Sequence, residues 1–365
     1  MGSHRKILFC GSLPPIVTNG VTISNMINLK ILSNAFDIDY VTEETMFHLH
    51  NKLAISKILA YLKSIINIIK KANFNKYEYF YLVFSVSLFG SLKTLFSILS
   101  FRIFNDGKII LHIHRGDFFT HFYTNSINKL LASIVFSNCY KIILLSDVQK
   151  TEFQNVFKNH KFHALPNTIE IEHSCELVNF SKYENRKDYD YKFLYISNYL
   201  IDKGIIDLLT VFENLCEKFP KITLQTYGAF TDQKMKNEII KFESQNIKIG
   251  GIVTGIEKFE ILKQYDCLIL PSWNEGMPLI LLEAMSVGTL VISTNVGLIP
   301  DLLGGKYPYL CYPKDRESLE KNILKFIDSN FKSELSKEMA TKYNSQYSQK
   351  THAHLLHNIF SQPLN

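Results

Sequence analysis

The sequence has few cysteines for its length. The 365 residues include six cysteines, which lie far apart and form no C-x-x-C pair. Several of them lie in apolar runs, so we expect reduced core residues of a cytosolic protein rather than disulfide partners. The twelve histidines include no H-E-x-x-H motif and no zinc-finger spacing, so no metal site is expected.

Long apolar runs are also missing. No uninterrupted stretch reaches the 18 or so apolar residues that a transmembrane helix needs. The chain passes almost directly from its first residues into a short apolar run at 6–10, which favours a strand over a signal peptide. We therefore expect a cytoplasmic protein.

Acidic residues are scarce in the first half of the chain. Residues 1–180 contain 18 Lys/Arg and 12 Asp/Glu, whereas residues 181–365 contain 22 of each. Residues 45–77 contain six lysines and no acid. No nucleic-acid-binding motif accompanies this charge, so a nucleic-acid partner is not expected.

Residues 51–72 have the pattern of a basic amphipathic helix. A helical arrangement places Lys52, Ser56, Lys63, Asn67 and Lys70 on one face and Ile55, Leu59, Leu62, Ile66 and Ile69 on the opposite one. Such a helix can lie on an anionic membrane surface. It can equally pack its apolar face on a protein core and leave its lysines in water. The sequence favours neither interpretation.

Apolar strands alternate with helical stretches along the chain. Strands are expected at 6–10, 79–84, 108–112 and 141–145, with a helix at 23–32. A polar segment at 181–191 follows, and a second series continues with strands at 192–197, 222–227 and 247–252 and helices at 204–218 and 233–244. The tail, 317–360, looks helical.

This alternation predicts an α/β protein with two Rossmann-like domains that face a cleft. The expected divisions are a first domain at 1–180, a linker at 181–191, a second domain at 192–345, and a C-terminal helix within 346–365 that packs back towards the first domain.

Residues 267–301 contain the most informative pattern. A strand at 267–270, a polar loop, a helix at 279–287 and a strand at 290–293 form one βαβ unit. Pro278 fits the first helical turn, and Gly288 fits the position just after the helix. Glu275 lies in the loop, on the side of a parallel sheet where ligands bind.

The start of this helix can bind an anion. The backbone N–H groups of Met277, Leu279 and Ile280 point out of it, helped by the helix dipole. Glu283 lies about one turn further along and is better placed for sugar hydroxyls. It could instead face solvent, but its neighbours are apolar on nearly every side, which indicates a buried, functional carboxylate.

With these flanks the stretch resembles the retaining nucleotide-sugar glycosyltransferases of glycosyltransferase family four, which have the GT-B architecture. The E-x7-E pattern of Glu275 and Glu283 within PSWNEGMPLILLEAMSVGTLVIST is the strongest part. Weaker segments follow in the family's order: SLPPIVTNGVT, LHIHRGDFF, LLSDVQKTEF and LYISNYLIDKGIIDLL.

The resemblance implies a role for each matching residue. Glu275 would bind hydroxyls of the donor sugar, and Glu283 would bind the ribose. Lys203 would neutralise the diphosphate, the role that a metal ion plays in other transferases. Further donor contacts would come from a glycine loop, from backbone N–H groups and from the reaction centre: Gly20, Gly276, Met277, Leu279, Ile280 and His114.

The sequence departs from the family at two positions. Asn198 stands where the family usually has an arginine, five residues before the lysine, so one positive charge is missing at the diphosphate. Asn198 could still donate a hydrogen bond to the donor. Arg115, next to His114, is unusual in the family and is a candidate replacement cation.

Three other candidates can be interpreted without the resemblance. His112 and His114 alternate at a strand end and therefore point the same way, and we expect His112 to be the structural one. Asp117 could contact an acceptor, as could Arg115, or Asp117 could only cap a helix. The D-x-D at 188–190 lies in the linker, so we interpret it as solvated charge.

The resulting hypothesis is a retaining, metal-independent hexosyl- or N-acetylhexosaminyl-transferase. It would use no cofactor and would take a nucleotide-diphosphate sugar, UDP-sugar before GDP-sugar. Its acceptor would be a glycan or lipid-linked glycan in bacterial surface polysaccharide (O-antigen or capsule) assembly. Peripheral membrane contact through 51–72 is part of this hypothesis. A catalytically weak scaffold for another transferase is the alternative, and a sugar-nucleotide epimerase fits the E-x7-E pattern less well.

Overall fold

The computed structural model describes residues 5–15, 19–42, 54–158, 160–170, 180–184 and 190–361, without the side chains of 54–57 and 181. The chain divides into two compact units, Met1–Thr168 with Gln349–Asn365 (unit 1) and Ile169–Ser348 (unit 2). Sequence analysis divided the chain at 181–191 and at 345/346. The contacts divide it at Thr168/Ile169 and at Ser348/Gln349.

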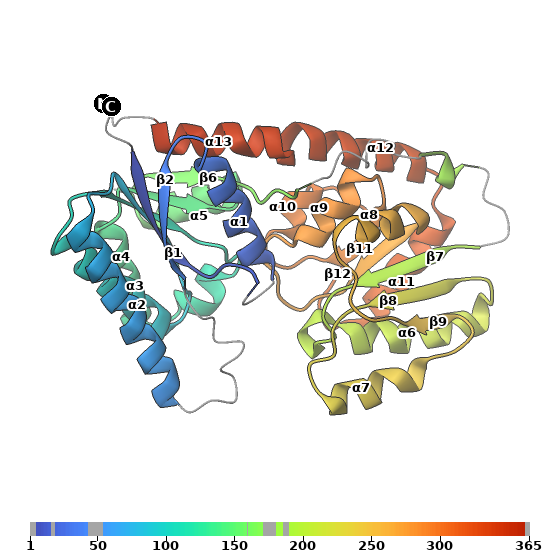
Figure 1. The fold of residues 1–365 in the computed structure, drawn as a ribbon. Helices are drawn as coiled ribbons and strands as arrows, with labels where there is room; N and C mark the ends of the chain where they lie inside the picture. The colour runs from blue at the N-terminus through green and yellow to red at the C-terminus, as the bar shows by residue number, and fades with distance from the viewer. Residues whose placement is uncertain are drawn as a thin grey trace. The chain divides into compact units, whose positions relative to one another are not determined.

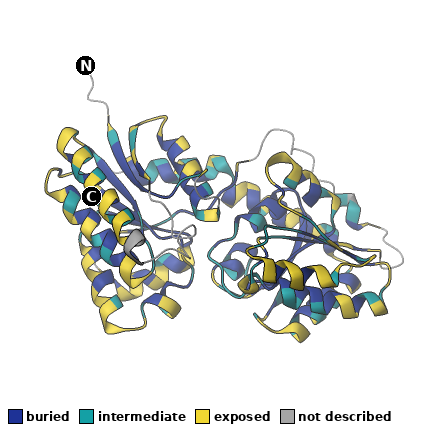
Figure 2. Cartoon of the chain, turned by 60° about the horizontal axis from the view of Figure 1, so that its bottom comes forward, coloured by how far each residue is buried: buried dark blue, intermediate teal, exposed yellow. Residues whose placement is uncertain are grey.

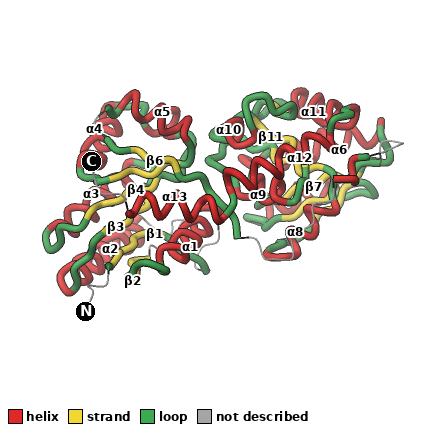
Figure 3. Tube along the Cα trace, turned by 90° about the horizontal axis from the view of Figure 1, so that it is seen from above, coloured by secondary structure: helices red, strands yellow, loops and turns green. Residues whose placement is uncertain are grey.

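Unit 1 is built on a six-stranded parallel sheet in the order β2-β1-β3-β4-β5-β6 (Figures 1 and 3). Its strands are β1 (Lys6–Gly11), β2 (Asp37–Thr42), β3 (Tyr79–Val83), β4 (Lys108–His112), β5 (Lys141–Leu144) and β6 (Phe162–Ala164). The central strands are apolar runs because helices cover both faces of the sheet. Sequence analysis missed β2 and β6, the two edge strands, which are polar or very short.

In the described part of unit 1, seven helices surround this sheet: α1 (Gly20–Leu32), α2 (Ala54–Phe74), α3 (Leu88–Arg102), the π-helix η2 (Phe118–Phe122), α4 (Ser126–Ser137), α5 (Asp147–Val156) and α13 (Gln349–Ser361). Helices α2 to α5 cover one face, with Ile68, Phe101, Phe136 and Phe153 in a common core. Helices α1 and α13 cover the other face, where Ile27 and Leu356 share a second core.

The C-terminal helix α13 is fixed to the strands of unit 1 by two side-chain hydrogen bonds. Lys141 Nζ donates to the Ile359 carbonyl at 2.6 Å, and Tyr79 Oη donates to the Phe360 carbonyl at 2.6 Å. The C-terminal helix α13 therefore packs on the sheet of unit 1.

Unit 2 has a second six-stranded parallel sheet, in the order β12-β11-β10-β7-β8-β9. Its strands are β7 (Lys192–Ile196), β8 (Thr223–Tyr227), β9 (Ile247–Ile249), β10 (Cys267–Leu270), β11 (Leu290–Thr294) and β12 (Leu310–Cys311). In both units the central strands of the sheet are buried, whereas an edge strand such as β2 is largely exposed (Figure 2).

The helices of unit 2 alternate with these strands. They are η4 (Phe180–Tyr183), η5 (Ile201–Lys203), α6 (Ile205–Lys218), α7 (Gln233–Ile239), η6 (Ile240–Phe242), α8 (Gly255–Gln264), α9 (Leu279–Ser286), α10 (Ile299–Leu303), α11 (Arg316–Asp328), α12 (Lys332–Lys342) and the π-helix η7 (Tyr343–Tyr347). The helical tail is thus three helical segments: α11, α12 continuing into η7, and α13.

These two parallel sheets confirm the predicted fold class of two α/β domains. The strands at 108–112 and 267–270 were predicted with their observed bounds. The helix expected at 23–32 begins earlier, at Gly20, because the preceding Asn19 caps it: Asn19 Oδ1 accepts from Thr22 N–H at 3.0 Å, and Thr22 Oγ1 accepts from Asn19 N–H at 3.0 Å. Among the described residues, no helix combines the length and the hydropathy that crossing a bilayer requires.

Candidate functional site

Lys203 and Glu275 form an ion pair at the carboxyl ends of two neighbouring strands of unit 2. Lys203 ends η5, which follows β7, and Glu275 lies in the loop after β10. Lys203 Nζ lies 2.7 Å from Glu275 Oε1, and Ser272 Oγ donates to the same oxygen at 2.7 Å. The chain therefore brings together two residues that sequence analysis assigned to one donor, because β7 and β10 are adjacent in the sheet.

Two glycines allow the backbone segments at this site to approach one another closely. Gly204 has φ of +71°, and a Cβ there would lie 2.1 Å from the Pro271 carbonyl oxygen. Gly297 has φ of +55°, and its Cβ would lie 1.9 Å from the Glu275 carbonyl oxygen. Only glycine fits at such positions, so these two residues allow the backbone segments around Lys203 and Glu275 to pack closely.

A set of polar bonds links the η5 segment to the loop after β10. Trp273 N–H donates to the Asp202 carbonyl at 2.8 Å, and Trp273 Nε1 donates to Asp207 Oδ2 at 3.1 Å. Arg316 Nε donates to the other oxygen of Asp207 at 2.8 Å. Sequence analysis missed these residues, which hold the Lys203–Glu275 pair in place, since no motif marks them.

Helix α9 begins beside Glu275. Pro278 is its N-cap, with extended backbone at φ −69° and ψ 127°, so the prediction that it lies in the first helical turn is wrong by one position. Leu279 and Ile280 are the first two helical residues, whose N–H groups have no partner within the helix. The Gly276 carbonyl accepts from Leu298 N–H at 3.1 Å, which fixes the turn before the helix. Met277 is buried at that turn.

Glu283 is buried further along α9. Its exposed fraction is 7%, which excludes the solvent-facing alternative. Burial raises the pKa of its carboxyl group, and the nearby Lys258 ammonium opposes that shift. Lys258 Nζ lies 2.5 Å from Glu283 Oε1. Sequence analysis missed Lys258, which lies on α8 and is brought to Glu283 only by the packing of α8 against α9.

Asn198 lies at the same edge of the sheet as Lys203, just after β7. Asn198 is exposed, and its backbone carbonyl accepts hydrogen bonds from Leu200 N–H at 2.8 Å and from Tyr195 Oη at 3.3 Å. These bonds hold the backbone of the turn and involve none of the side-chain amide.

In unit 1 the paired histidines lie together at the end of β4. Their ring centroids are 3.8 Å apart. His112 Nδ1 contacts Tyr81 Oη at 2.7 Å, which supports its structural interpretation. His114 is buried, and neither of its ring nitrogens has a hydrogen-bond partner among the described residues. Burial lowers the pKa of His114 to about 3, so the ring is neutral at neutral pH.

Behind His112, a chain of buried polar groups crosses to α13. Asn28 Nδ2 donates to Tyr81 Oη at 3.1 Å, and Asn28 Oδ1 lies 2.6 Å from His352 Nε2. His352 Nδ1 lies 2.7 Å from the Pro166 carbonyl oxygen. Burial lowers the pKa of His352 to about 4. These bonds join β3, β4, α1 and α13 into one buried network.

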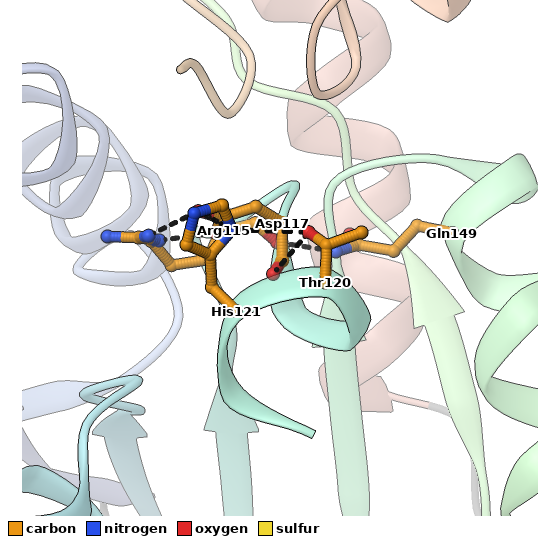
Figure 4. A network of polar contacts seen from close by, with 5 residues as sticks. All are labelled: Arg115, Asp117, Thr120, His121 and Gln149. Carbon is orange, nitrogen blue, oxygen red and sulfur yellow. Dashed lines mark hydrogen bonds and ion pairs between the residues drawn. The ribbon is translucent and has the colours of Figure 1, made fainter. Parts of the chain in front are cut away.

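Arg115 and Asp117 form a bidentate ion pair after β4 (Figure 4). Arg115 Nε donates to Asp117 Oδ1 at 2.6 Å, and the other guanidinium nitrogen contacts Oδ2. His121 Nδ1 lies 3.3 Å from Asp117 Oδ2, and Gln149 Nε2 donates to the Arg115 carbonyl at 2.6 Å. Asp117 occupies the N-cap position of helix η2, as one alternative expected, but its side chain makes no cap bond there.

A cavity of about 410 Å³ lies next to this ion pair, also in unit 1. Its lining consists of Gly116, Phe119, Thr120, Glu152, Asn155 and Val156. Burial raises the pKa of Glu152. Sequence analysis missed this cavity because its lining comes from two segments, one after β4 and one on α5.

Three predictions of sequence analysis lie partly or wholly outside the described residues. Gly20 is described and is the first residue of α1, while 16–18 of the preceding loop are not. The D-x-D at 188–190 is described only at Asp190, and 51–53 of the basic segment are not described. Within the described ranges, no three His, Cys, Asp or Glu side chains lie together as a metal site would require.

Comparison with known proteins identifies the C-terminal part of the chain. Residues 179–346 match the family described as glycosyl transferases group 1. These residues form a glycosyltransferase group 1 domain. The domain contains Lys203, Glu275 and Glu283.

Curated relatives are similar over part of their length. An uncharacterised glycosyltransferase of Methanocaldococcus jannaschii is 26% identical over 250 residues, which is 61% of this chain and 60% of that protein. A putative teichuronic acid biosynthesis glycosyltransferase of Bacillus subtilis is 24% identical over 46% of this chain and 41% of its own. The chain thus spans about half the length of the curated relatives it matches.

Solved structures are similar over nearly the whole chain. The sucrose-phosphate synthase of Thermosynechococcus elongatus superposes with a TM-score of 0.73 at 12% identity, over 98% of both chains. An Anabaena protein solved with UDP and glucose superposes with a TM-score of 0.66 at 13% identity, over 99% of this chain and 100% of that one. The fold is therefore that of the GT-B glycosyltransferases, as predicted.

Proposed function

We propose that this protein is a glycosyltransferase that moves a sugar from a nucleotide-diphosphate donor to a hydroxyl group of a glycan. The observation that carries the proposal is the Lys203–Glu275 ion pair beside the start of α9, with Glu283 buried further along that helix. A cation, a helix N-terminus and two carboxylates at one sheet edge suit a ligand with a diphosphate and several hydroxyl groups.

Each donor group has a proposed partner in unit 2. Lys203 and the N–H groups of Leu279 and Ile280 would bind the diphosphate, together with the backbone of Gly276 and Met277. Glu275 would accept hydrogen bonds from sugar hydroxyls, and Glu283 from the ribose. Asn198, exposed near Lys203, would donate a hydrogen bond to the diphosphate. Relatives solved with UDP support UDP-sugars before GDP-sugars.

The proposed chemistry is retaining and needs no metal ion. The acceptor hydroxyl oxygen would bond to the anomeric carbon while the bond between that carbon and the diphosphate oxygen breaks. Negative charge would grow on the leaving oxygen, and the departing diphosphate would take the hydroxyl proton. Lys203 and the start of α9 would stabilise this charge. His114 is neutral and buried, and its two ring nitrogens have no hydrogen-bond partner within the described ranges, so it would bond to the reacting sugar. Gly20, in unit 1, would contribute to donor binding.

The acceptor is proposed to bind unit 1. The cavity beside Arg115 and Asp117 contains one carboxylate, Glu152, and an aromatic ring, Phe119. Aromatic rings and carboxylates suit the faces and hydroxyl groups of sugars, so a glycan fits this cavity better than a phosphate does. A glycan of bacterial surface polysaccharide, carried on a lipid at the cytoplasmic face of the membrane, is the proposed acceptor class.

Transfer assays with a panel of nucleotide sugars test the proposal. The Lys203→Ala variant should lose about 100-fold or more in turnover, because a main charge at the leaving group is gone. Glu283→Ala should weaken donor binding. The matched control is Lys218→Ala, which removes an exposed lysine from the end of α6. Wild-type rates in both site variants would refute the assignment.

One activity measurement and one binding measurement refine the result. Turnover that survives removal of divalent metal with EDTA is expected, and its loss would refute the metal-independent part. Calorimetry with UDP and GDP tests the scaffold alternative, which the missing charge at Asn198 favours. A chain that binds neither nucleotide would be a scaffold and not a transferase.

A further inference from the structure

The outer surface of helices α2, α3 and α4 exposes an unusual number of large apolar side chains. Helix α2 has Leu59, Leu62 and Ile66 in a row, and α4 has Ile127, Leu130 and Ile134. On and just after α3, the exposed row is Phe89, Phe96, Leu99 and Ile103. Phe89 is 69% exposed, Ile127 63% and Leu59 59%. We call these ten residues the apolar rows.

The three rows face the same side of unit 1. The inward side chains of these helices, including Ile68, Phe101 and Phe136, pack on one face of the sheet. Residues of a helix that lie opposite its buried stripe point away from the sheet. The helices are neighbours, α2 beside α3 and α3 beside α4 (Figure 1). The exposed rows of the three helices therefore lie on one surface.

The pattern of exposure along α2 differs from the one expected from sequence. Lysines and apolar residues were predicted on opposite faces, yet Lys63 and Lys70 are exposed together with Leu62 and Ile66. The side that faces the core instead buries Ser64, Ile68 and Ala72. A purely structural helix would bury its larger apolar residues, so this arrangement indicates a surface that is covered by something else.

All the charge on this surface has one sign. Helices α2, α3 and α4 contain no aspartate and no glutamate along their entire lengths. Lys63, Lys70, Arg102 and Lys129 are exposed on them. A partner for this surface must therefore accept apolar side chains and supply negative charge at the same time.

We propose that the outer surface of α2, α3 and α4 binds a bilayer that contains anionic lipids. The apolar rows enter the boundary between headgroups and acyl chains, and the four cations contact lipid phosphates. A second copy of the chain is disfavoured because it would bring like charges together. Protein interfaces in general are poor in lysine. The proposal rests on this surface alone and requires neither a donor nor an acceptor sugar.

Vesicle flotation tests the proposal directly. The full chain should float with phosphatidylcholine vesicles that contain phosphatidylglycerol, and much less with phosphatidylcholine alone. Raising the salt concentration should release it, because the attraction between cations and lipid phosphates is screened. A chain that stays in solution with both kinds of vesicle would overturn the proposal.

Two double variants separate the apolar and the charged contributions. Phe89→Ser with Phe96→Ser should abolish flotation, since both rings are exposed and their loss leaves the core intact. Lys63→Glu with Lys70→Glu should weaken partitioning about tenfold or more on anionic vesicles. The matched control is Ile240→Ser with Lys234→Glu, which changes exposed residues of unit 2 and should float like the wild type.

Two further measurements make the outcome decisive. Thermal melting of each variant should match the wild type, so that lost flotation is not lost folding. Sedimentation of the free chain should show a monomer. A dimer that the phenylalanine variants dissociate, together with no flotation, would assign the surface to a second copy and overturn the proposal. Transfer to a water-soluble acceptor should be unchanged in all surface variants, which separates this result from failure of the proposed function.

Discussion

The candidate donor residues of unit 2 and His114 of unit 1 differ in how their polar groups are satisfied. In unit 2 the candidate residues are paired with one another: Lys203 with Glu275, and Lys258 with Glu283. In unit 1 the buried His114 has two ring nitrogens without partners in the part of the chain that the structure describes. The paired groups of unit 2 are held ready before a ligand arrives, whereas His114 remains unsatisfied until something donates to it or accepts from it.

The units also differ in their content of histidine and of acidic residues. Every histidine of the chain except His173 belongs to unit 1, and His173 is outside the described residues. Unit 1 also contains the helices without acids. This difference means that acid, salt and mutation should affect the two units unequally, and the four experiments below use that inequality.

The largest effect is expected from a glycine of unit 2. Gly297→Ala places a methyl group 1.9 Å from the Glu275 carbonyl oxygen at a positive φ, so the site loop must move. We expect a loss of about 3 kcal/mol or more in the free energy of unfolding, measured by urea denaturation. Gly255→Ala has a similar φ of +59° with open space around it and should cost less. Equal losses would show that the close approach to Glu275 does not matter.

Acid should destabilise unit 1 selectively. The pKa of His352 falls from 6.5 to about 4 on folding, so between these values the unfolded chain binds more protons than the folded one. Stability is therefore lost as pH falls from about 6.5 to about 4, by up to about 3 kcal/mol for this residue. His114, whose pKa is lowered to about 3, adds a loss of the same sign.

Glu283 should change the stability of unit 2 in the opposite direction as pH falls. Its pKa is raised in the folded state, so the folded chain binds more protons just above the ordinary carboxyl pKa and stability rises as pH falls there. Hydrogen exchange of peptides from each unit, measured across this pH range, separates the two effects. His352→Gln should flatten the response of unit 1, while His354→Gln, an exposed residue on the same helix, should not. A parallel loss in both units would refute the distinction.

The predictability of the fold and site can be judged from these same residues. Glu275 and Glu283 could be predicted because they lie in a local pattern of one βαβ unit, whereas Lys203 was predicted only from the resemblance to a known family. Lys258, Asp207 and the cavity beside Asp117 could not be, because each depends on which elements pack together. His352 lies far along the chain from His112, and only the return of α13 to the first sheet joins them.

A smaller effect is expected from breaking the buried pair of unit 2. Lys258→Met leaves the Glu283 carboxylate without its partner, and that side chain is only 9% exposed. We expect a loss of about 2 kcal/mol, less than for a fully buried pair because water already reaches the lysine of the pair. Adding Glu283→Gln should restore much of this stability, as thermal melting would show. No recovery in the double variant would mean that Glu283 acts through other contacts.

The smallest effect is expected from restoring a charge. Asn198→Arg adds a guanidinium at the exposed turn after β7, near Lys203. It should bind a nucleotide diphosphate more tightly by roughly 1 kcal/mol, about fivefold, in calorimetry with UDP. The control is Lys234→Arg, which keeps its positive charge on the surface of α7. Asn246→Arg is unsuitable as a control, because Asn246 Nδ2 donates hydrogen bonds to two backbone carbonyls. Weaker binding would place the diphosphate elsewhere.

The sequence by itself determined the features that depend on neighbours along the chain. It fixed the alternation of strands and helices, the two parallel sheets, and the spacing of Glu275 and Glu283, because these follow from apolar periodicity and from turn residues. Only the tertiary structure decided which groups meet: Lys203 with Glu275, Lys258 with Glu283, and α13 with the first sheet. It also decided which side of α2 faces water, because the depth of a helix against its sheet depends on every element packed beside it.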